Sequence, residues 1–189
     1  MKKRNILIPL LLTLILFCSC SETVTYKREI NRAPSLEYFT IEDLLEESDV
    51  IAEIEVMENI GETNDPDYKT FFQADVITVI KGDKNMASLK FMQGVNSEYL
   101  FEGYPIFEAG QKLVLFLKSA TGSNYPDDMY WINGDYLSVI KIHEYEGTIY
   151  AKKLIGSFRD IPAEEPTKML NGTQYKLDDL VAAIQQRMD

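Results

Sequence analysis

A β-rich fold is indicated by the stretch Val50-Ile51-Ala52-Glu53-Ile54-Glu55-Val56-Met57. Every second residue from Val50 to Val56 is apolar, which is the period of a strand with one buried face. The run Leu113-Val114-Leu115-Phe116-Leu117 is apolar throughout, which predicts a central strand buried on both faces. Further strands are expected at residues 70–80, 88–93, 130–132, 137–145 and 148–152.

Two helices flank these strands. Thr40-Ile41-Glu42-Asp43 has the form of a capping box, so a short helix is expected to run to about Glu47. A second helix is expected from about Leu177 to Met188, where the apolar residues form one stripe. Gly, Asn and Pro mark a loop near residues 61–66, and residues 94–110 fit no single period, which predicts a long loop. The pattern is mainly β, with a helix at each end.

The N-terminus has the features of an export signal. A basic start, Met1 to Arg4, precedes an apolar run from Ile6 to Phe17 that is too short to span a membrane as a helix. Phe17-Cys18-Ser19-Cys20 resembles a bacterial lipobox, in which a cysteine after a small residue receives diacylglycerol and palmitate. Cys20 fits this position better than Cys18, because Phe17 is bulky. We therefore expect a signal peptide at 1–19, lipidated Cys20 with a tether to residue 35, and one domain at 36–189.

Composition argues against several functions. The chain of 189 residues has a formal net charge of −11, and removal of residues 1–19 takes away three basic and no acidic side chains. Nucleic acid is therefore not expected as a partner, because its phosphates require clustered Lys and Arg. With two cysteines and a single histidine, a zinc site is not expected. The sequence contains no nucleotide-binding glycine loop and no Gly-x-Ser-x-Gly motif, and we predict no metal or cofactor.

Three segments carry a resemblance: Ser48-Asp49-Val50-Ile51-Ala52-Glu53-Ile54, Phe72-Gln73-Ala74-Asp75-Val76-Ile77-Thr78-Val79-Ile80-Lys81-Gly82 and Gly110-Gln111-Lys112-Leu113-Val114-Leu115-Phe116-Leu117. Their succession resembles uncharacterised bacterial cell-surface proteins. It is also similar to the oligonucleotide/oligosaccharide-binding (OB) barrel of tissue inhibitors of metalloproteinases and netrin modules. The resemblance covers about residues 40–118 and implies a small OB-fold-like barrel, with a β-sandwich as the alternative. It does not carry the inhibitory activity, because that activity needs a free N-terminal cysteine.

Aromatic side chains are the best sequence candidates for a binding site. These are Tyr99, Phe101, Tyr104, Phe107 and Trp131, which could line a groove at one rim of a barrel. The interpretation that we favour is that they fold back and close the barrel end, because large apolar residues are more often core than site. His143 is interpreted as a surface or structural residue, because a lone histidine seldom forms a site.

Three functional hypotheses remain. The first, favoured by elimination, is a membrane-anchored extracytoplasmic lipoprotein that acts as a non-catalytic binding module for an envelope protein or glycan. The second is an envelope hydrolase, which needs two carboxylates converging in one cleft. The third is a structural envelope lipoprotein without a specific ligand.

Overall fold

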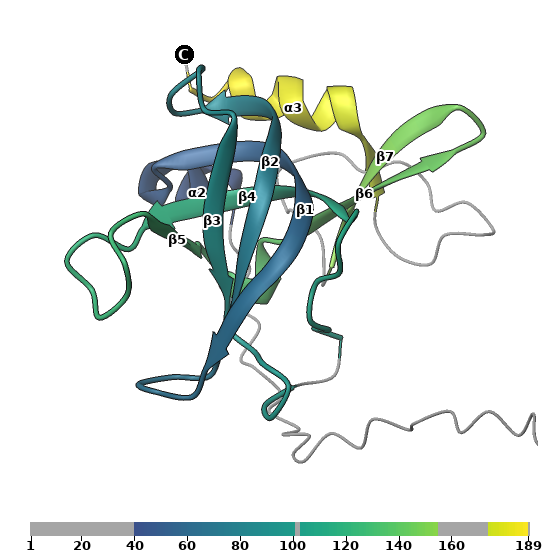
Figure 1. Ribbon diagram of the computed structural model, residues 1–189. Helices are drawn as coiled ribbons and strands as arrows, with labels where there is room; N and C mark the ends of the chain where they lie inside the picture. The colour runs from purple at the N-terminus through teal and green to yellow at the C-terminus, as the bar shows by residue number, and fades with distance from the viewer. Residues whose placement is uncertain (1–39, 101–102, 155–173, 189) are drawn as a thin grey trace, which may run out of the picture.

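The computed structural model describes residues 40–100, 103–154 and 174–188. Eight strands form one sheet that curls on itself (Figure 1). Their bounds are β1 Val50–Thr63, β2 Lys69–Lys81, β3 Ser88–Gln93, β4 Lys112–Ser119, β5 Met129–Ile132, β6 Ile140–Tyr145, β7 Thr148–Lys153 and β8 Gln174–Lys176. Two α-helices, α2 Ile41–Glu47 and α3 Leu177–Gln185, and a 3₁₀ turn, η2 Asp135–Leu137, complete the described elements.

Five of the strands close a barrel. They follow the order β1-β2-β3-β5-β4, and β4 pairs again with β1, so the sheet meets its own first strand. The β3–β5 pairing is parallel, while the other barrel pairings are antiparallel. The expected mainly β, OB-fold-like barrel with two flanking helices is thus confirmed, and the β-sandwich alternative is not the arrangement found. Closure also leaves these five strands with few unpaired edges.

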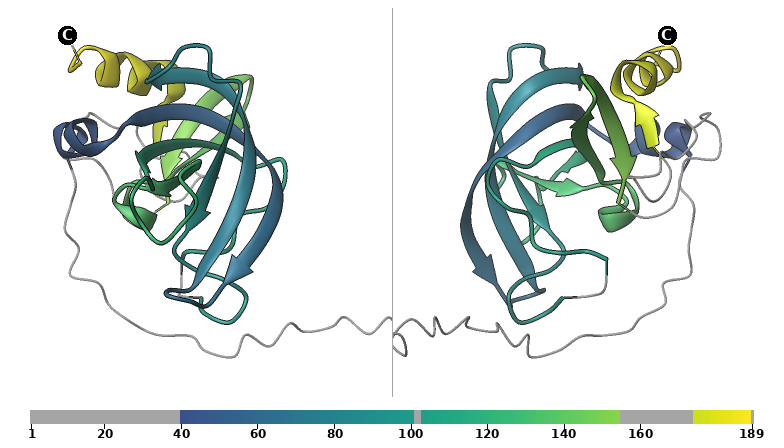
Figure 2. Two further views of the ribbon diagram at one scale, coloured as in Figure 1. Left: turned by 60° about the vertical axis from the view of Figure 1, so that its left-hand side comes forward. Right: turned by 90° about the vertical axis from the view of Figure 1, so that its right-hand side faces the viewer.

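The remaining three strands extend the sheet away from the barrel. Strand β6 joins β4 through only two residue pairs, Leu113–Lys141 and Val114–Ile140, and β7 and β8 follow in antiparallel order. Helix α3 lies outside the barrel, against β7 and β8 (Figure 2). Strand β4 therefore lies between two cores. Leu113, Leu115 and Leu117 face the barrel core, while Val114 and Phe116 face a second core under α2 and α3.

Side-chain hydrogen bonds stabilise both ends of helix α2. The Asp43 backbone N–H donates to Thr40 Oγ1 at 3.1 Å, and the Thr40 N–H donates to Asp43 Oδ2 at 2.9 Å, which is the predicted capping box. At the other end, Lys81 Nζ donates to the carbonyl oxygens of Leu45 and Ser48 at 2.5 and 2.6 Å. This ammonium satisfies carbonyls that the last helical turn leaves open.

Several element boundaries differ from the prediction. Strand β1 continues to Thr63 through the expected loop at Gly61, because register shifts near Val56 and Asn59 let it stay paired with β2. Strand β6 begins at Ile140, three residues after Leu137, because Asp135–Leu137 forms the 3₁₀ turn. The short strand β8 was not expected, and α3 ends at Gln185 rather than Met188.

The expected signal peptide, the tether and Cys20 lie outside the described residues. Within the described ranges, none of the helices combines the length and the apolar character that a membrane crossing requires.

Candidate functional site

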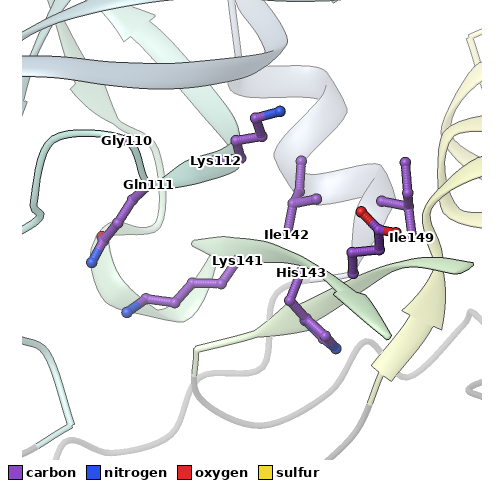
Figure 3. A pocket seen from close by; sticks show the side chains of 8 residues that line it. Gly110, Gln111, Lys112, Lys141, Ile142, His143 and Ile149 are labelled. Carbon is purple, nitrogen blue, oxygen red and sulfur yellow. The ribbon is translucent and has the colours of Figure 1, made fainter. Parts of the chain in front are cut away.

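A groove opens where strands β4 and β6 separate. Its volume is about 310 Å³, at the lower end of the range for small-ligand sites. The segment before β4 and the β6–β7 hairpin supply its walls, and we call it the β6 groove (Figure 3). The lining residues are Gly110, Gln111, Lys112, Lys141, Ile142, His143, Glu144 and Ile149.

The groove follows from strand register. Lys141 is the last residue of β6 that pairs with β4, whereas the pairing with β7 continues to Tyr145–Thr148. A two-residue turn, Glu146-Gly147, closes the hairpin with φ values of 50° and 76°. These positive angles are typical of a type I′ turn, whose twist matches that of the strands. The outer part of β6 is therefore a strand edge facing the groove.

The turn type also determines where the backbone groups of β6 point. In a two-residue hairpin the residues flanking the turn form a hydrogen-bonded pair, and such pairs alternate with non-bonded ones. Tyr145 and His143 therefore direct their N–H and C=O groups toward β7. Glu144, which stands opposite Ile149 in a non-bonded pair, directs its N–H and C=O toward the groove.

Side chains alternate across this edge. Ile142 and Ile149 project to one side of the hairpin, and Lys141 and His143 to the other (Figure 3). Ile149 is 50% exposed, which is the largest exposed fraction among the exposed large apolar residues described. The first side also carries the exposed Glu144, the cross-strand partner of Ile149, and so combines apolar surface with one carboxylate, while the second side carries Lys141 and the imidazole of His143.

One buried polar atom at the groove, Gln111 Oε1, has no hydrogen-bond partner within the described part of the chain. An unsatisfied buried polar atom costs about 1–3 kcal/mol. Burial lowers the pKa of His143 below its usual range, the Gln174 amide opposes this shift, and the Lys152 ammonium adds to it. The imidazole stacks on Tyr150, with ring centroids 5.9 Å apart.

Two lysines, Lys112 and Lys141, line the groove together with one carboxylate, Glu144. Lys141 and Lys152 are cross-strand partners on β6 and β7, and so lie on one side of the sheet. Among the described residues, no ion pair engages Lys141, while Lys112 makes only a long contact of 4.0 Å with Glu55. An anionic group bound beside Lys141 would therefore gain an ion pair.

The lining residues do not form a familiar catalytic pair. His143 and Glu144 are neighbours on one strand, so their side chains leave opposite faces of the sheet. Glu144 is the single carboxylate of the groove lining. In the described ranges, no three His, Cys, Asp or Glu side chains gather in a way that suits a metal ion. The arrangement is suited to binding through hydrogen bonds and charge.

The sequence-predicted aromatic residues lie elsewhere and do not form one surface. Tyr104 and Phe107 are buried in the barrel core, with exposed fractions of 0% and 3% and ring centroids 5.9 Å apart. Tyr99 is half-buried and stacks on Tyr68 at 5.0 Å. Trp131 belongs to a separate cluster, where it packs edge-on against Tyr125. Phe101 and Cys20 fall outside the described residues.

A second polar cluster holds the long loop after β3. The Tyr104 hydroxyl donates to Asp135 Oδ1 at 3.0 Å, and the Phe107 N–H donates to Gln93 Oε1 at 3.1 Å. Asp135 adopts a φ of 47°, and its carboxylate lies so close to Gly94 that a Cβ there would be 2.9 Å from Oδ2. Burial raises the pKa of Asp135. Burial also raises the pKa of Tyr104, and the negative charge of Asp135 raises it further. This cluster is enclosed by packing, so we assign it a structural role.

Sequence analysis missed the β6 groove because the gap depends on where two distant strands stop pairing. The signal that was available is the hairpin itself: Glu146-Gly147 between two short strands, with Lys141 and His143 on one side and Ile142 and Glu144 on the other. That pattern predicts the faces of the hairpin, but not its open edge.

The sequence matches no protein-family model, and no curated protein is significantly similar to it. Fold and site together define a closed five-stranded OB-like barrel extended by a three-stranded sheet that carries a groove at its junction.

Proposed function

We propose that this protein is a non-catalytic binding module of a bacterial cell envelope. In this proposal a lipid on Cys20 holds the module at the membrane, and its ligand or partner occupies the β6 groove. The observation that carries the proposal is the outer edge of β6, which has no partner strand among the described residues, with the buried Gln111 Oε1 beside it, which has no hydrogen-bond partner there. A ligand that supplies a partner for this atom relieves its desolvation cost.

The composition of the groove supports binding over hydrolysis. A carboxylate-driven hydrolase needs two carboxyl groups converging from different strands with unequal environments. Glu144 is the one carboxylate among the lining residues, and alternation directs it away from His143. The hydrolase therefore remains the second hypothesis, without an observation that favours it.

Photo-crosslinking in cells tests the binding function. We would place a photoreactive side chain at Ile149, which is 50% exposed beside the groove, and at Ile77 on β2, which is 46% exposed, as the matched control. We expect a discrete crosslinked product from position 149 and none of that size from position 77. Identical patterns from the two positions, or no product from either, would overturn the proposed function in favour of a structural lipoprotein.

The anchor is tested separately by labelling cells with palmitate and separating their membranes. We expect the parent protein to carry the label and to sediment with membranes, because two or more acyl chains anchor a protein stably. The Cys20→Ser variant should lose both properties, whereas Cys18→Ser should keep them. Labelled Cys20→Ser protein would contradict lipidation at this residue.

A further inference from the structure

We infer that the β6 groove binds an extended peptide whose side chains alternate between acidic and apolar, and that this peptide adds to the sheet as a strand beside β6. The inference rests on the proposed binding function and names the class of partner. It combines three observations: the outer edge of β6, which has no partner strand among the described residues, the exposed Ile149 on one face of that edge, and Lys141 on the other face, which makes no ion pair within the described ranges.

The backbone edge selects a peptide. Glu144 directs its N–H and C=O into the groove, and β6 has no partner strand beyond Lys141 in the described ranges. These groups are spaced to pair with another backbone, as in proteins that add a peptide strand to a sheet edge. Sugar sites, by contrast, are commonly built on aromatic platforms, and the lining residues include no Tyr, Phe or Trp.

The two faces of the edge select the side-chain pattern. Residues of an added strand alternate between the faces, so every second side chain lies on the face of Ile142, Glu144 and Ile149. Ile149 is half exposed in the protein alone. An apolar side chain beside it is therefore favoured, because its binding removes apolar surface from water. The intervening side chains lie on the face of Lys141 and His143.

The charge on that second face selects acidic residues. Lys141 lies there beside the half-buried His143, whose ring nitrogens are able to take part in hydrogen bonds. No described residue forms an ion pair with Lys141, so a peptide carboxylate beside it would form one. A basic side chain at the same place meets like charge.

Peptide titration of the full-length protein in detergent micelles tests the inference. The probe is a fluorescent, end-blocked peptide of alternating Glu and Val. One control peptide has Lys in place of Glu, and another keeps the Glu–Val sequence but carries N-methyl groups on alternate backbone nitrogens. We expect saturable binding of the Glu–Val peptide and binding at least about tenfold weaker for both controls.

Two variants of one residue isolate the backbone contribution. Glu144 is exposed and its N–H faces the groove, so Glu144→Pro removes a groove donor without removing a hydrogen bond to β7. We expect Glu144→Pro to weaken peptide binding about tenfold, while Glu144→Ala, which keeps the N–H, binds as the parent does or more tightly. Circular dichroism checks that each variant folds. Lys141→Glu is a further variant that keeps every backbone donor, and we expect it to bind the Glu–Val peptide about tenfold more weakly than the parent does.

The outcomes separate this inference from the function on which it rests. Equal binding of the Glu and Lys peptides, equal affinities for Glu144→Pro and Glu144→Ala, or no peptide binding would overturn the inference. If crosslinking from position 149 still succeeds in that case, the groove binds a partner of another class and the binding function stands. Sedimentation of the parent as a dimer that Glu144→Pro dissociates would identify a second copy of the chain as the occupant, and would also overturn the inference.

Discussion

Asp135 shows how one residue links backbone strain, burial and charge. It holds a left-handed backbone conformation that disfavours most residues other than Gly, Asn and Asp, and it accepts a hydrogen bond from Tyr104. Through Tyr104 it ties the loop after β3 to the connection between β5 and β6. The loop is therefore held in place by a titratable group.

The pH dependence of stability should reveal this carboxyl group. Burial raises the pKa of Asp135 above its ordinary value of 3.8 in the folded protein. The folded state then binds more protons than the unfolded state between the two pKa values, so the contribution of Asp135 is fully present below the unfolded value and is lost as pH rises through the folded one. We expect the parent to lose stability relative to Asp135→Asn as pH rises from below 3.8, as measured by urea unfolding. A difference between the two proteins that stays constant with pH would contradict this assignment.

Aromatic residues show the limit of inference from single positions. The sequence predicts that the long loop carries aromatic side chains near the barrel end, but composition does not distinguish a binding rim from a core. Burial separates Tyr104 and Phe107, which pack inside the barrel, from Tyr99 and Trp131, which remain half-buried. That separation depends on contacts with β3, β5 and η2, which no local pattern contains.

At the scale of elements, helix α2 was the most predictable feature because its signals are local. The Thr40–Asp43 capping box is present as the sequence indicates. The lysine that stabilises the other end was not predictable, since Lys81 lies 36 residues from Leu45 in the chain. Strand β8 was missed for a similar reason, because three residues carry too little periodicity to predict a strand.

Replacement of Lys81 tests its role at the end of α2. Lys81→Met removes an ammonium that donates to two carbonyl groups, so we expect a loss of about 1–3 kcal/mol in the free energy of unfolding. Lys118→Met is the matched control, since Lys118 makes an exposed ion pair with Glu47 at 3.7 Å and should contribute about 0–1 kcal/mol. Denaturant titration compares the two variants. Equal losses would show that the contacts of Lys81 with α2 contribute no more than a surface ion pair.

At the scale of the whole molecule, β4 unites the barrel and its extension. The resemblance over residues 40–118 implied a barrel, and the structure confirms it. The pairings that close the barrel could not be predicted from the sequence. Strands β3 and β5 pair in parallel although β4 lies between them in the chain, and β1 pairs with β4 although β2 and β3 lie between those two. Alternation along a strand predicts its faces, whereas the neighbours of the strand depend on the global topology.

Because β4 contributes to both cores, the barrel and its extension should unfold together. Leu115→Ala opens a space in the barrel core and Phe116→Ala opens one under the helices, and each should cost about 2–5 kcal/mol. We expect fluorescence of the single tryptophan, Trp131, and far-ultraviolet circular dichroism to give coincident transitions for both variants. A separate, earlier transition for Phe116→Ala that leaves Trp131 fluorescence unchanged would show that the extension unfolds independently.

The central claim is that the outer edge of β6 is open and available to a partner strand. Amide hydrogen exchange, measured residue by residue by NMR on the protein alone, tests it most directly. The structure predicts slow exchange at His143 and Tyr145, whose N–H groups point toward β7, and fast exchange at Glu144, which lies between them. Slow exchange at all three amides would mean that the edge is already paired, and would contradict the account.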